Sequence, residues 1–467
     1  MQYVCCIFIP LQMKKINYIS IVFVFLMGVA SQAQTKAWTL EECVRYAIKN
    51  NITIKQSELD TISANIDKRG AFGRFLPSAN LSGSHSWNIG LNQDITTGLL
   101  RNQTTQFSNV GANVGVDIYK GMQNLNTLRR ANLSIVAAKY NLTKMQEDIA
   151  LNVANAFLQV LFNKENLKVQ QEQLSINEKQ YKRSEELVKA GSIPRGDLLD
   201  VKATVATNKQ NVVAAENALL ISKLGLAQLL QLKEFWDFDV IDDTNIKDEN
   251  NIMAVKPIDI YAKAKENRIE LKIAKTNLEM AEKDVLISKG AYQPRLSAYY
   301  GFASRVSYAD TYDPQTGQVG PPKSPWEQLQ TNKGQNFGLQ LAIPVFNGFS
   351  VKNSVDHSKI NLEKTKIALE KADLDLQRNV YTAFTDAKGA MNAHESAITA
   401  LESREEAYNY AKEKYAVGLM NSFDFNQSQT LLTNAQSEVI RTKYDYIFKI
   451  KILEFYFGIP IEQIMKQ

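Results

Sequence analysis

Side chains that carry out enzymatic chemistry are scarce in this sequence. Its three histidines are His85, His357 and His394, and none has a second histidine four residues away, the spacing by which a helix holds zinc. There is no cysteine cluster and no glycine-rich loop ahead of a Lys-Ser or Lys-Thr pair. We therefore expect no catalytic residues, no metal and no cofactor. We place His85 in a strand, facing a lumen or an interface, and His394 on a solvated helix surface.

Two carboxylates at equal distances from a glycine are more informative. Asp197 follows Gly191 by six residues, and Asp424 follows Gly418 by the same interval. Each begins a predicted helix, where Asp is a favoured capping residue and complements the helix dipole, so a structural role is one interpretation. The glycines likewise suit tight turns between two helices.

The composition favours long helices over a compact α/β body. In 467 residues, 54 Lys and Arg stand against 49 Asp and Glu, which gives a net charge of +5. This excess is too weak for a dedicated nucleic-acid-binding protein, so we expect no nucleic-acid partner. Aromatic residues make up 9 % of the chain, which is few for a large globular core.

Residues 1–33 are typical of a secretory signal peptide. Lys14 and Lys15 precede an apolar run over 16–27, and small residues follow up to Ala33. We predict cleavage after Ala33 and consider Met13 a candidate for the true start. The alternative is an N-terminal anchor helix.

The predicted mature chain has one thiol, Cys43, so no intrachain disulfide is expected. After Ala33 no apolar run reaches about 18 residues, and we therefore expect no transmembrane helix. An exported chain without one is periplasmic, secreted or an outer-membrane β-protein.

The sequence contains an internal duplication. Shifting it by 217 residues aligns Asn50 with Asn267 and Pro77 with Pro294. Beyond residue 110 the best shift is 227, and it aligns Gly121 with Gly348, Phe157 with Phe384, Gly191 with Gly418, and Asp197 with Asp424. The change from a shift of 217 to one of 227 means that the two copies differ in length by ten residues, between about 90 and 110 in the first copy. Because insertions collect in exposed loops, this difference predicts loop tips near 90–110 and near 308–333. We divide the chain into a first repeat over 34–235, a linker over 236–256 and a second repeat over 257–467.

Each copy has the same predicted elements. A short helix over 40–49 or 258–265 is followed by a second helix that ends near Arg74 or Gly290. Two strands come next, because apolar residues alternate with Gly, Asn, Asp or Gln. The alternating apolar residues are Val110, Ala112, Val114, Val116 and Ile118 in the first copy, and Phe337, Leu339, Leu341, Ile343 and Val345 in the second. Their partner strands are predicted over 81–89 and 296–306, which gives four strands in all.

A very long helix is predicted after the strands of each copy, to about Lys189 or Tyr415. Neither stretch contains proline. About 65 helical residues span about 100 Å, far beyond a globular helix. A second helix returns from Asp197 to about Leu230, and from Asp424 to about Tyr456.

Four amphipathic strands do not make a finished structure. Their open edges would leave backbone groups unpaired, and a membrane accepts strands only in a closed barrel of about eight or more. The chain should therefore combine its strands with those of other copies, its apolar residues facing lipid and its polar residues facing a wet lumen. Trp87, Tyr119 and Phe346 are candidate aromatics at the membrane interface. The helices are too polar for lipid and would continue the tube as a coiled-coil wall.

These features resemble the outer-membrane efflux protein family, the TolC-like channels, over essentially the whole mature length. The matching segments are Pro77 and Pro294 ahead of a strand, the strand exits 117–121 and 344–348, and the helical turns around Gly191 and Gly418. The resemblance implies a mainly helical fold with a membrane β-barrel. Duplicated helix–strand–strand–helix units would form, as a homotrimer, a barrel of about twelve strands in outer-membrane lipid, on a long periplasmic helical tunnel.

The resemblance also implies partners and a function. The chain would be the exit duct for substrates delivered by a periplasmic adaptor protein and an inner-membrane pump of the RND or ABC type, the latter as in type I secretion. Val417, Gly418 and Leu419 resemble the family's tip motif, where the adaptor docks. Ala190, Gly191 and Ser192 are the weaker counterpart.

A gating role for the carboxylates rests on the same resemblance. A carboxylate at Asp424 is expected to join an acidic ring at a closed aperture, which would favour cations. Asp197 is expected to bond Tyr415 or a neighbouring copy and latch the aperture. Gln427 stands where some family members carry a second acid, so a doubled ring is not expected.

Two other classes of protein compete with a channel. A periplasmic coiled coil or fibre explains the long helices but not the paired, duplicated strands. A substrate-specific porin explains strands but requires many more of them.

Overall fold

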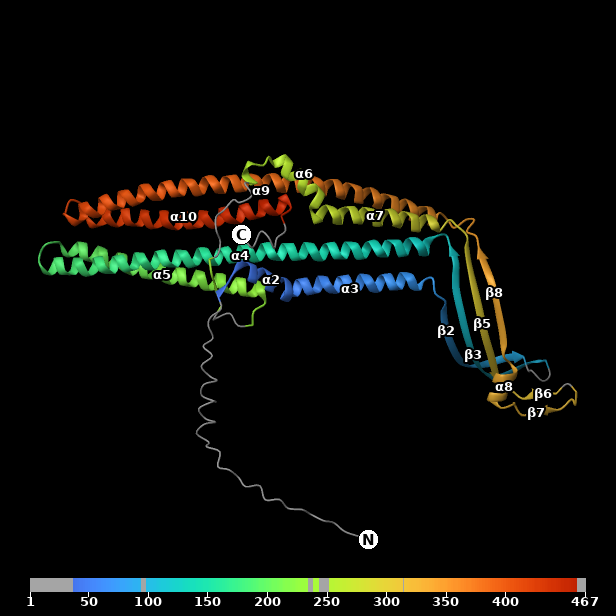
Figure 1. Cartoon of the computed structure of the whole chain (residues 1–467). Helices are drawn as coiled ribbons and strands as arrows, with labels where there is room; N and C mark the ends of the chain where they lie inside the picture. The colour runs from blue at the N-terminus through green and yellow to red at the C-terminus, as the bar shows by residue number, and fades with distance from the viewer. Residues whose placement is uncertain (1–36, 94–97, 234–237, 243–251, 314, 460–467) are drawn as a thin grey trace, which may run out of the picture.

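The chain folds into long helices that lie side by side, with a sheet at one end (Figure 1). The computed structural model describes residues 37–93, 98–233, 238–242, 252–313 and 315–459. The predicted signal peptide lies outside the described residues.

The helices of the two halves have equal lengths. Those of the first half are α2 (Leu40–Asn50), α3 (Ile52–Gly73), α4 (Gln123–Lys189) and α5 (Arg195–Leu230). Those of the second half are α6 (Pro257–Asn267), α7 (Ile269–Gly290), α9 (Ser350–Ala416) and α10 (Ser422–Phe457). Both halves have helices of 11, 22, 67 and 36 residues in this order. The predicted duplicated helical architecture is therefore present, whereas the repeat and linker boundaries stay predictions.

Local signals set where the short helices begin and end. Thr39 caps α2 in a reciprocal capping box with Glu42. The two short helices are separate, as predicted, because the Asn51 side chain accepts the backbone N–H of Thr53 and starts α3. The same side chain donates to the Leu229 carbonyl at 3.0 Å, which ties this joint to the end of α5.

The sheet has four antiparallel strands in the order β2-β3-β5-β8. They are β2 (Ser78–Gln93), β3 (Leu100–Lys120), β5 (Arg295–Ser307) and β8 (Gly334–Ala342). The prediction of four strands is confirmed, but their bounds differ. β2 and β3 continue through most of the predicted loop at 90–110. β8 ends before Val345, because Pro344 has no N–H to offer a ladder.

Short elements occupy the other predicted loop, 308–333. They are β6 (Thr311–Tyr312), β7 (Val319–Gly320) and the helix α8 (Pro325–Thr331), which Ser324 caps. Gln328 of α8 hydrogen-bonds both backbone groups of Ser307, so α8 is fixed on the end of β5.

The register puts most of the large apolar side chains of the sheet on one face. Ala112 pairs with both Leu81 and Phe302, and Tyr300 pairs with Phe337, so these positions point the same way. The face comprises Leu81, Trp87, Ile89, Leu91, Val110, Ala112, Val114, Val116, Leu296, Ala298, Tyr300, Phe302, Phe337, Leu339 and Leu341, and we call it the apolar face. Within the described strands it has no Asp, Glu, Lys or Arg. The opposite face, which we call the polar face, has mostly Ser, Asn, Gly, Thr and Gln, together with the charged residues of the four strands and with Phe107 and Tyr299.

Aromatic residues flank the apolar face. At the loop end His85 contacts Trp87 and Tyr308 edge to face. At the helix end a β-bulge between Asp117 and Tyr119 puts Tyr119 opposite Leu296, on the apolar face. Such girdles mark the two interfaces of membrane barrels; that Trp87 and Tyr119 lie at these interfaces stays a prediction. Phe346 is exposed near the same end and packs on Phe349.

The apolar core lies midway along the helices. One cluster joins α2, α4, α5 and α10 around Phe157, Leu161, Leu226 and Leu230. A second joins α6, α7, α9 and α10 around Ile260, Leu376 and Leu453. The two-residue strands β1 (Ala37–Trp38) and β4 (Asp239–Val240) pair beside the first cluster, and the short 3-10 helix η1 (Ile252–Ala254) joins the second. The helical hairpin α4–α5 and the helical hairpin α9–α10 are therefore both packed into an apolar core at this level.

One described helix, α5, is long and apolar enough to cross a membrane, although the sequence predicted none. Its length and composition alone are weak evidence for a span. α5 packs antiparallel along α4, and its Leu226 and Leu230 are buried in the core. Val213 and Ile221 of the same helix stay exposed in the single chain, so packing within one chain covers only part of its apolar surface.

Candidate functional site: the helical tips and the seam between hairpins

Two turns form the end of the molecule opposite the sheet (Figure 1). Gly191 and Gly418 adopt left-handed backbone angles, with φ of 71° and 78°. In each turn the residue after glycine donates its N–H back into the helix: Ser192 to the Leu187 carbonyl and Leu419 to the Lys414 carbonyl, both at 2.8 Å. This is the Schellman arrangement, in which glycine avoids the cost of a Cβ.

The second turn presents apolar side chains to solvent. Val417 is 70 % exposed, Leu419 79 % and Phe423 71 %. Sequence reasoning selected Val417 and Leu419 but missed Phe423. In the first turn Ala190 and Ser192 offer only small side chains. The two turns therefore share a backbone shape but differ in what they offer a partner.

Asp424 and Asp197 occupy the same position, the third residue of α10 and of α5. Asp424 is exposed and exchanges two hydrogen bonds with Asn421: its N–H donates to Asn421 Oδ1 at 2.8 Å, and its Oδ2 accepts from Asn421 Nδ2 at 2.9 Å. At α5 the capping position is Pro194, which offers no side-chain cap. The N-cap of α10 is therefore Asn421 and not Asp424 as predicted, because α10 begins two residues earlier than expected; the Asp424 carboxylate lies in the first turn, where it complements the helix dipole, and it remains exposed at the tip.

Tyr415 serves a packing role within the chain. Its ring stacks on Phe425, with centroids 4.6 Å apart and planes 9° apart. Among the described residues no hydrogen bond joins Tyr415 to Asp197. A latch through a neighbouring copy stays a prediction.

Polar contacts join the two hairpins near their tips, and sequence reasoning missed them. Ser422 Oγ donates to Asp200 Oδ2 at 3.3 Å, and Asn426 Nδ2 donates to Thr204 Oγ1 at 3.2 Å. Farther along, Ser437 bonds Asn166 at 2.9 Å. We call this line of contacts along α10 the polar seam. Its only signal in the sequence is small polar residues at helical spacing, at positions 422, 426, 429, 433 and 437.

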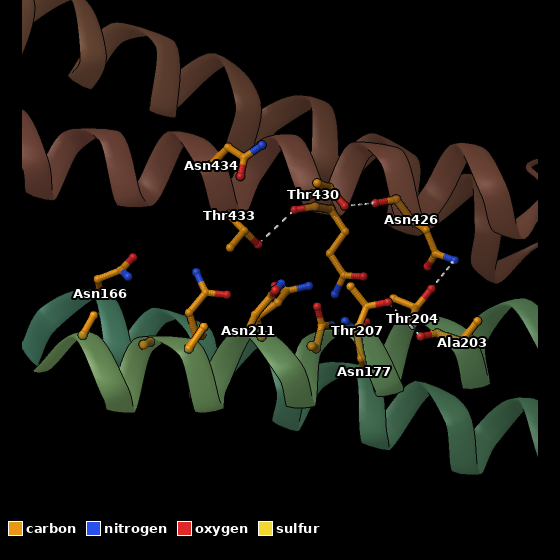
Figure 2. A pocket seen from close by; sticks show the side chains of 17 residues that line it. Asn166, Asn177, Ala203, Thr204, Thr207, Asn211, Asn426, Thr430, Thr433 and Asn434 are labelled. Atoms are coloured by element: carbon orange, nitrogen blue, oxygen red, sulfur yellow. Dashed lines mark hydrogen bonds between the residues drawn. The ribbon is translucent and has the colours of Figure 1, made fainter. Parts of the chain in front are cut away.

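A pocket of about 600 Å³ lies in the polar seam, between α4, α5 and α10 (Figure 2). Asparagine, glutamine, threonine and alanine line it, without a charged group. Asn177 and Gln429 are each 2 % exposed, and amide atoms of both have no hydrogen-bond partner among the described residues. The pocket can donate and accept hydrogen bonds, but it has no acid, base or nucleophile.

The seam becomes apolar toward the middle of the molecule. Tyr444, Ile447, Ile450 and Leu453 continue the same side of α10 into the two core clusters. The hairpins are therefore joined by hydrogen bonds near the tips, at about 0.5–1.5 kcal/mol each, and by apolar burial at the core.

His394 and Cys43 lie away from the helical tips. Among the described residues no group of three His, Cys, Asp or Glu side chains could hold a metal ion. His394 is not on a solvated surface as predicted: it hydrogen-bonds Thr442 and stacks on Tyr446, because α9 and α10 pack at this level, and this burial lowers its pKa. Burial also raises the pKa of Cys43 to about 12, so its thiol is unreactive at neutral pH.

Comparison with known proteins agrees with this architecture. The model of the outer membrane efflux protein family matches residues 44–231 and 260–451. Outer membrane protein TolC of Escherichia coli (strain K12) is 21 % identical over 316 residues, which are 65 % of this chain and 59 % of TolC. Nodulation protein T of Rhizobium leguminosarum bv. viciae is 21 % identical over 412 residues, 86 % of this chain and 78 % of that protein.

A solved structure shows the same fold. The Campylobacter jejuni CmeC outer membrane channel superposes with a TM-score of 0.75 at 17 % identity, covering 90 % of this chain and 85 % of CmeC. The two matches of the family model cover both halves of the chain and most of its length. The chain therefore belongs to the outer membrane efflux protein family, with its sheet in the outer membrane and its helices in the periplasm.

Proposed function

We propose that three copies of this chain close into a twelve-stranded barrel above a periplasmic helical tunnel, and that cargo leaves the cell through it. The observation that carries the proposal is the sheet: one uncharged apolar face, one polar face, and free edges at β2 and β8. Because four strands alternate in direction, β8 of one copy runs antiparallel to β2 of the next. Copies can therefore join around a ring without a break in the ladder.

The test is to isolate the protein from the outer-membrane fraction and measure conductance in a planar bilayer. Heat-modifiable oligomers that form stable pores support the channel. Recovery as a soluble periplasmic species without conductance would favour the fibre. Pores formed by a single copy would favour a porin.

We further propose that the second turn docks a periplasmic adaptor, which connects the tunnel to an RND-type or ABC-type pump. The exposed Val417, Leu419 and Phe423 support this proposal, because apolar side chains held out at a tip suit a helical groove on a partner. The smaller turn at Ala190, Gly191 and Ser192 would be the weaker docking point.

Replacing Gly418 by valine is expected to abolish efflux while the barrel still inserts. A Cβ at Gly418 meets no atom within 4 Å, so the cost comes from the left-handed backbone, at about 1–2 kcal/mol, and from the change it forces in the turn. Efflux and heat-modifiable oligomers would be measured in cells. Gly389→Val is the matched control, since Gly389 is an exposed helical residue of α9 and should tolerate valine. Normal efflux by Gly418→Val would remove the turn from docking.

We propose that Asp424 of three copies forms the negative ring of the aperture, with Asp197 and Tyr415 close by. Asp424→Asn should raise single-channel conductance and reduce block by multivalent cations. Asparagine keeps an oxygen for the bond from Asn421, so this variant removes the charge and leaves the cap. Asp197→Asn is the comparison at the equivalent position. Unchanged traces for Asp424→Asn would exclude Asp424 from the aperture.

A further inference from the structure

The charged residues of the sheet all lie on its polar face. The described strands have four basic residues, Arg101, Lys120, Arg295 and Arg305, and one acid, Asp117. Arg101 pairs with Asn92 near the loop end of the sheet, and Arg305 pairs with Asn109 in the middle of β3; both are polar-face positions. Between Arg305 and the helix end the polar face is uncharged. The four strands therefore bring three net positive charges per chain to the polar face.

A β-bulge assembles the group at the helix end. Without it, Lys120 would follow the even positions of β3 onto the apolar face. The irregularity between Asp117 and Tyr119 shifts the register, so Lys120 lies opposite Arg295 on the polar face. The bulge therefore moves Lys120 from the apolar face to the polar face, next to Arg295, and so brings two positive charges together.

Asp117 holds these two cations in place. Its Oδ1 accepts from Arg295 Nη2 at 2.8 Å, and its Oδ2 lies 3.3 Å from Lys120 Nζ. The Asp117 side chain is 17 % exposed, whereas those of Arg295 and Lys120 are 52 % and 36 % exposed. The carboxylate is thus covered, and the donors that it does not use stay accessible.

These residues border a cavity of about 460 Å³ on the polar face, at the junction of the strands with α3 and α4. Arg74 lines it as a third cation, beside Ser78, Ser297 and Tyr299. Three cations and one anion give the cavity a net charge of +2. Together with hydroxyl donors, this charge suits an oxyanion such as a carboxylate or phosphate group.

We propose that the barrel lumen favours anions and that the cavity around Arg74, Lys120 and Arg295 binds oxyanion groups of the cargo. This inference rests on the proposed channel, because three copies would bring about nine net positive charges to one lumen, whose low-dielectric wall focuses their field. The charge is opposite to that of the Asp424 aperture, so cargo with both a cationic and an anionic group would meet a complementary charge at each stage.

The test uses the full-length oligomer in a planar bilayer, with Asp424→Asn as background so that the aperture does not set the selectivity. The reversal potential in a potassium chloride gradient should show a preference for chloride, and inorganic pyrophosphate should reduce the conductance. Lys120→Gln should raise the half-blocking pyrophosphate concentration about tenfold, the effect of losing one charged contact. Arg101→Gln combined with Arg305→Gln should lower the chloride preference. Lys49→Gln, on the exposed surface of α2, should change neither property.

The outcomes separate this inference from the proposed channel. Stable pores that prefer potassium in the Asp424→Asn background, or that respond to pyrophosphate identically in Lys120→Gln and Lys49→Gln, would overturn the inference and leave the channel intact. Absence of pores from the wild-type oligomer would overturn the channel and this inference with it.

Discussion

A lysine at position 339 is expected to abolish assembly in the outer membrane. Leu339 lies in β8 on the apolar face, opposite Ala298 and between Phe337 and Leu341, and it is 68 % exposed in the single chain. If that face meets lipid, a lysine costs up to about 2–4 kcal/mol, the value at the bilayer midplane, and less toward the interface; Leu339 lies one same-face position from Leu341, which is level with Tyr119. Each barrel would bear this cost once per copy. The measurement is the amount of heat-modifiable oligomer in the outer-membrane fraction.

The neighbouring residue provides the control. Gln340 pairs with Ser297 on the polar face, so Gln340→Lys adds the same charge to the same strand but points it into the lumen. This variant should assemble at wild-type levels. Normal assembly of Leu339→Lys together with failure of Gln340→Lys would mean that the polar face meets lipid. Equal, normal assembly of both would mean that neither face does.

The helices were predictable because their signals are local and repeated. The long stretches without proline and the two shifts of the duplication each depend on neighbouring residues or on an internal copy. The strand ends were less predictable. In β3 the segment near the loop has polar residues on both faces, for instance Gln103 and Thr105 on the polar face and Asn102 and Thr104 on the apolar face, so alternation stops before the strand does.

The same distinction applies to the candidate site. The turns were found because glycine is needed where the backbone is left-handed. The polar seam was not found, because it joins residues far apart in sequence, as with Asp200 and Ser422, which are 222 residues apart. A small polar residue on a helix has the same neighbours in sequence whether its side chain faces solvent or another helical hairpin. His394 was misplaced for this reason, since only the packing of α9 on α10 covers it.

Replacing Arg268 by methionine is expected to cause the largest loss of stability in the helical body. Arg268 is 5 % exposed and precedes α7. Its Nη2 lies 2.8 Å from Glu147 Oε2 and 3.0 Å from Glu270 Oε1, and its guanidinium lies over the Phe455 ring at 3.8 Å. It therefore joins α4 of the first half to α7 and α10 of the second. Removing one partner of a buried ion pair costs about 3–5 kcal/mol, because the remaining charge is left uncompensated.

The loss should depend on pH. Burial opposes ionisation of Glu270, but the hydrogen bonds and the charge of Arg268 outweigh the effect of burial and lower the pKa of Glu270. A lowered carboxyl pKa contributes stability that is present above the unfolded-state pKa and is lost as the pH falls through the folded-state pKa. In Arg268→Met that contribution disappears. Burial already raises the pKa of Glu147, and without Arg268 burial will raise the pKa of Glu270 as well. The stability deficit of the variant should therefore be largest at neutral pH and should shrink as the pH falls through and below about 4.3, the unfolded-state pKa of glutamate, where these carboxyls bind protons.

Urea unfolding of the oligomer in detergent, followed by helical circular dichroism at pH 7 and at about pH 4, measures both effects. Arg441→Met is the matched control, because Arg441 pairs with Glu438 on the exposed surface of α10, where such pairs contribute about 0–1 kcal/mol. If both variants lost the same stability at pH 7, the buried cluster would be no more important than a surface pair. A deficit in Arg268→Met that stayed constant with pH would assign the loss to packing on Phe455, since stacking on an aromatic ring does not depend on the protonation of the two glutamates.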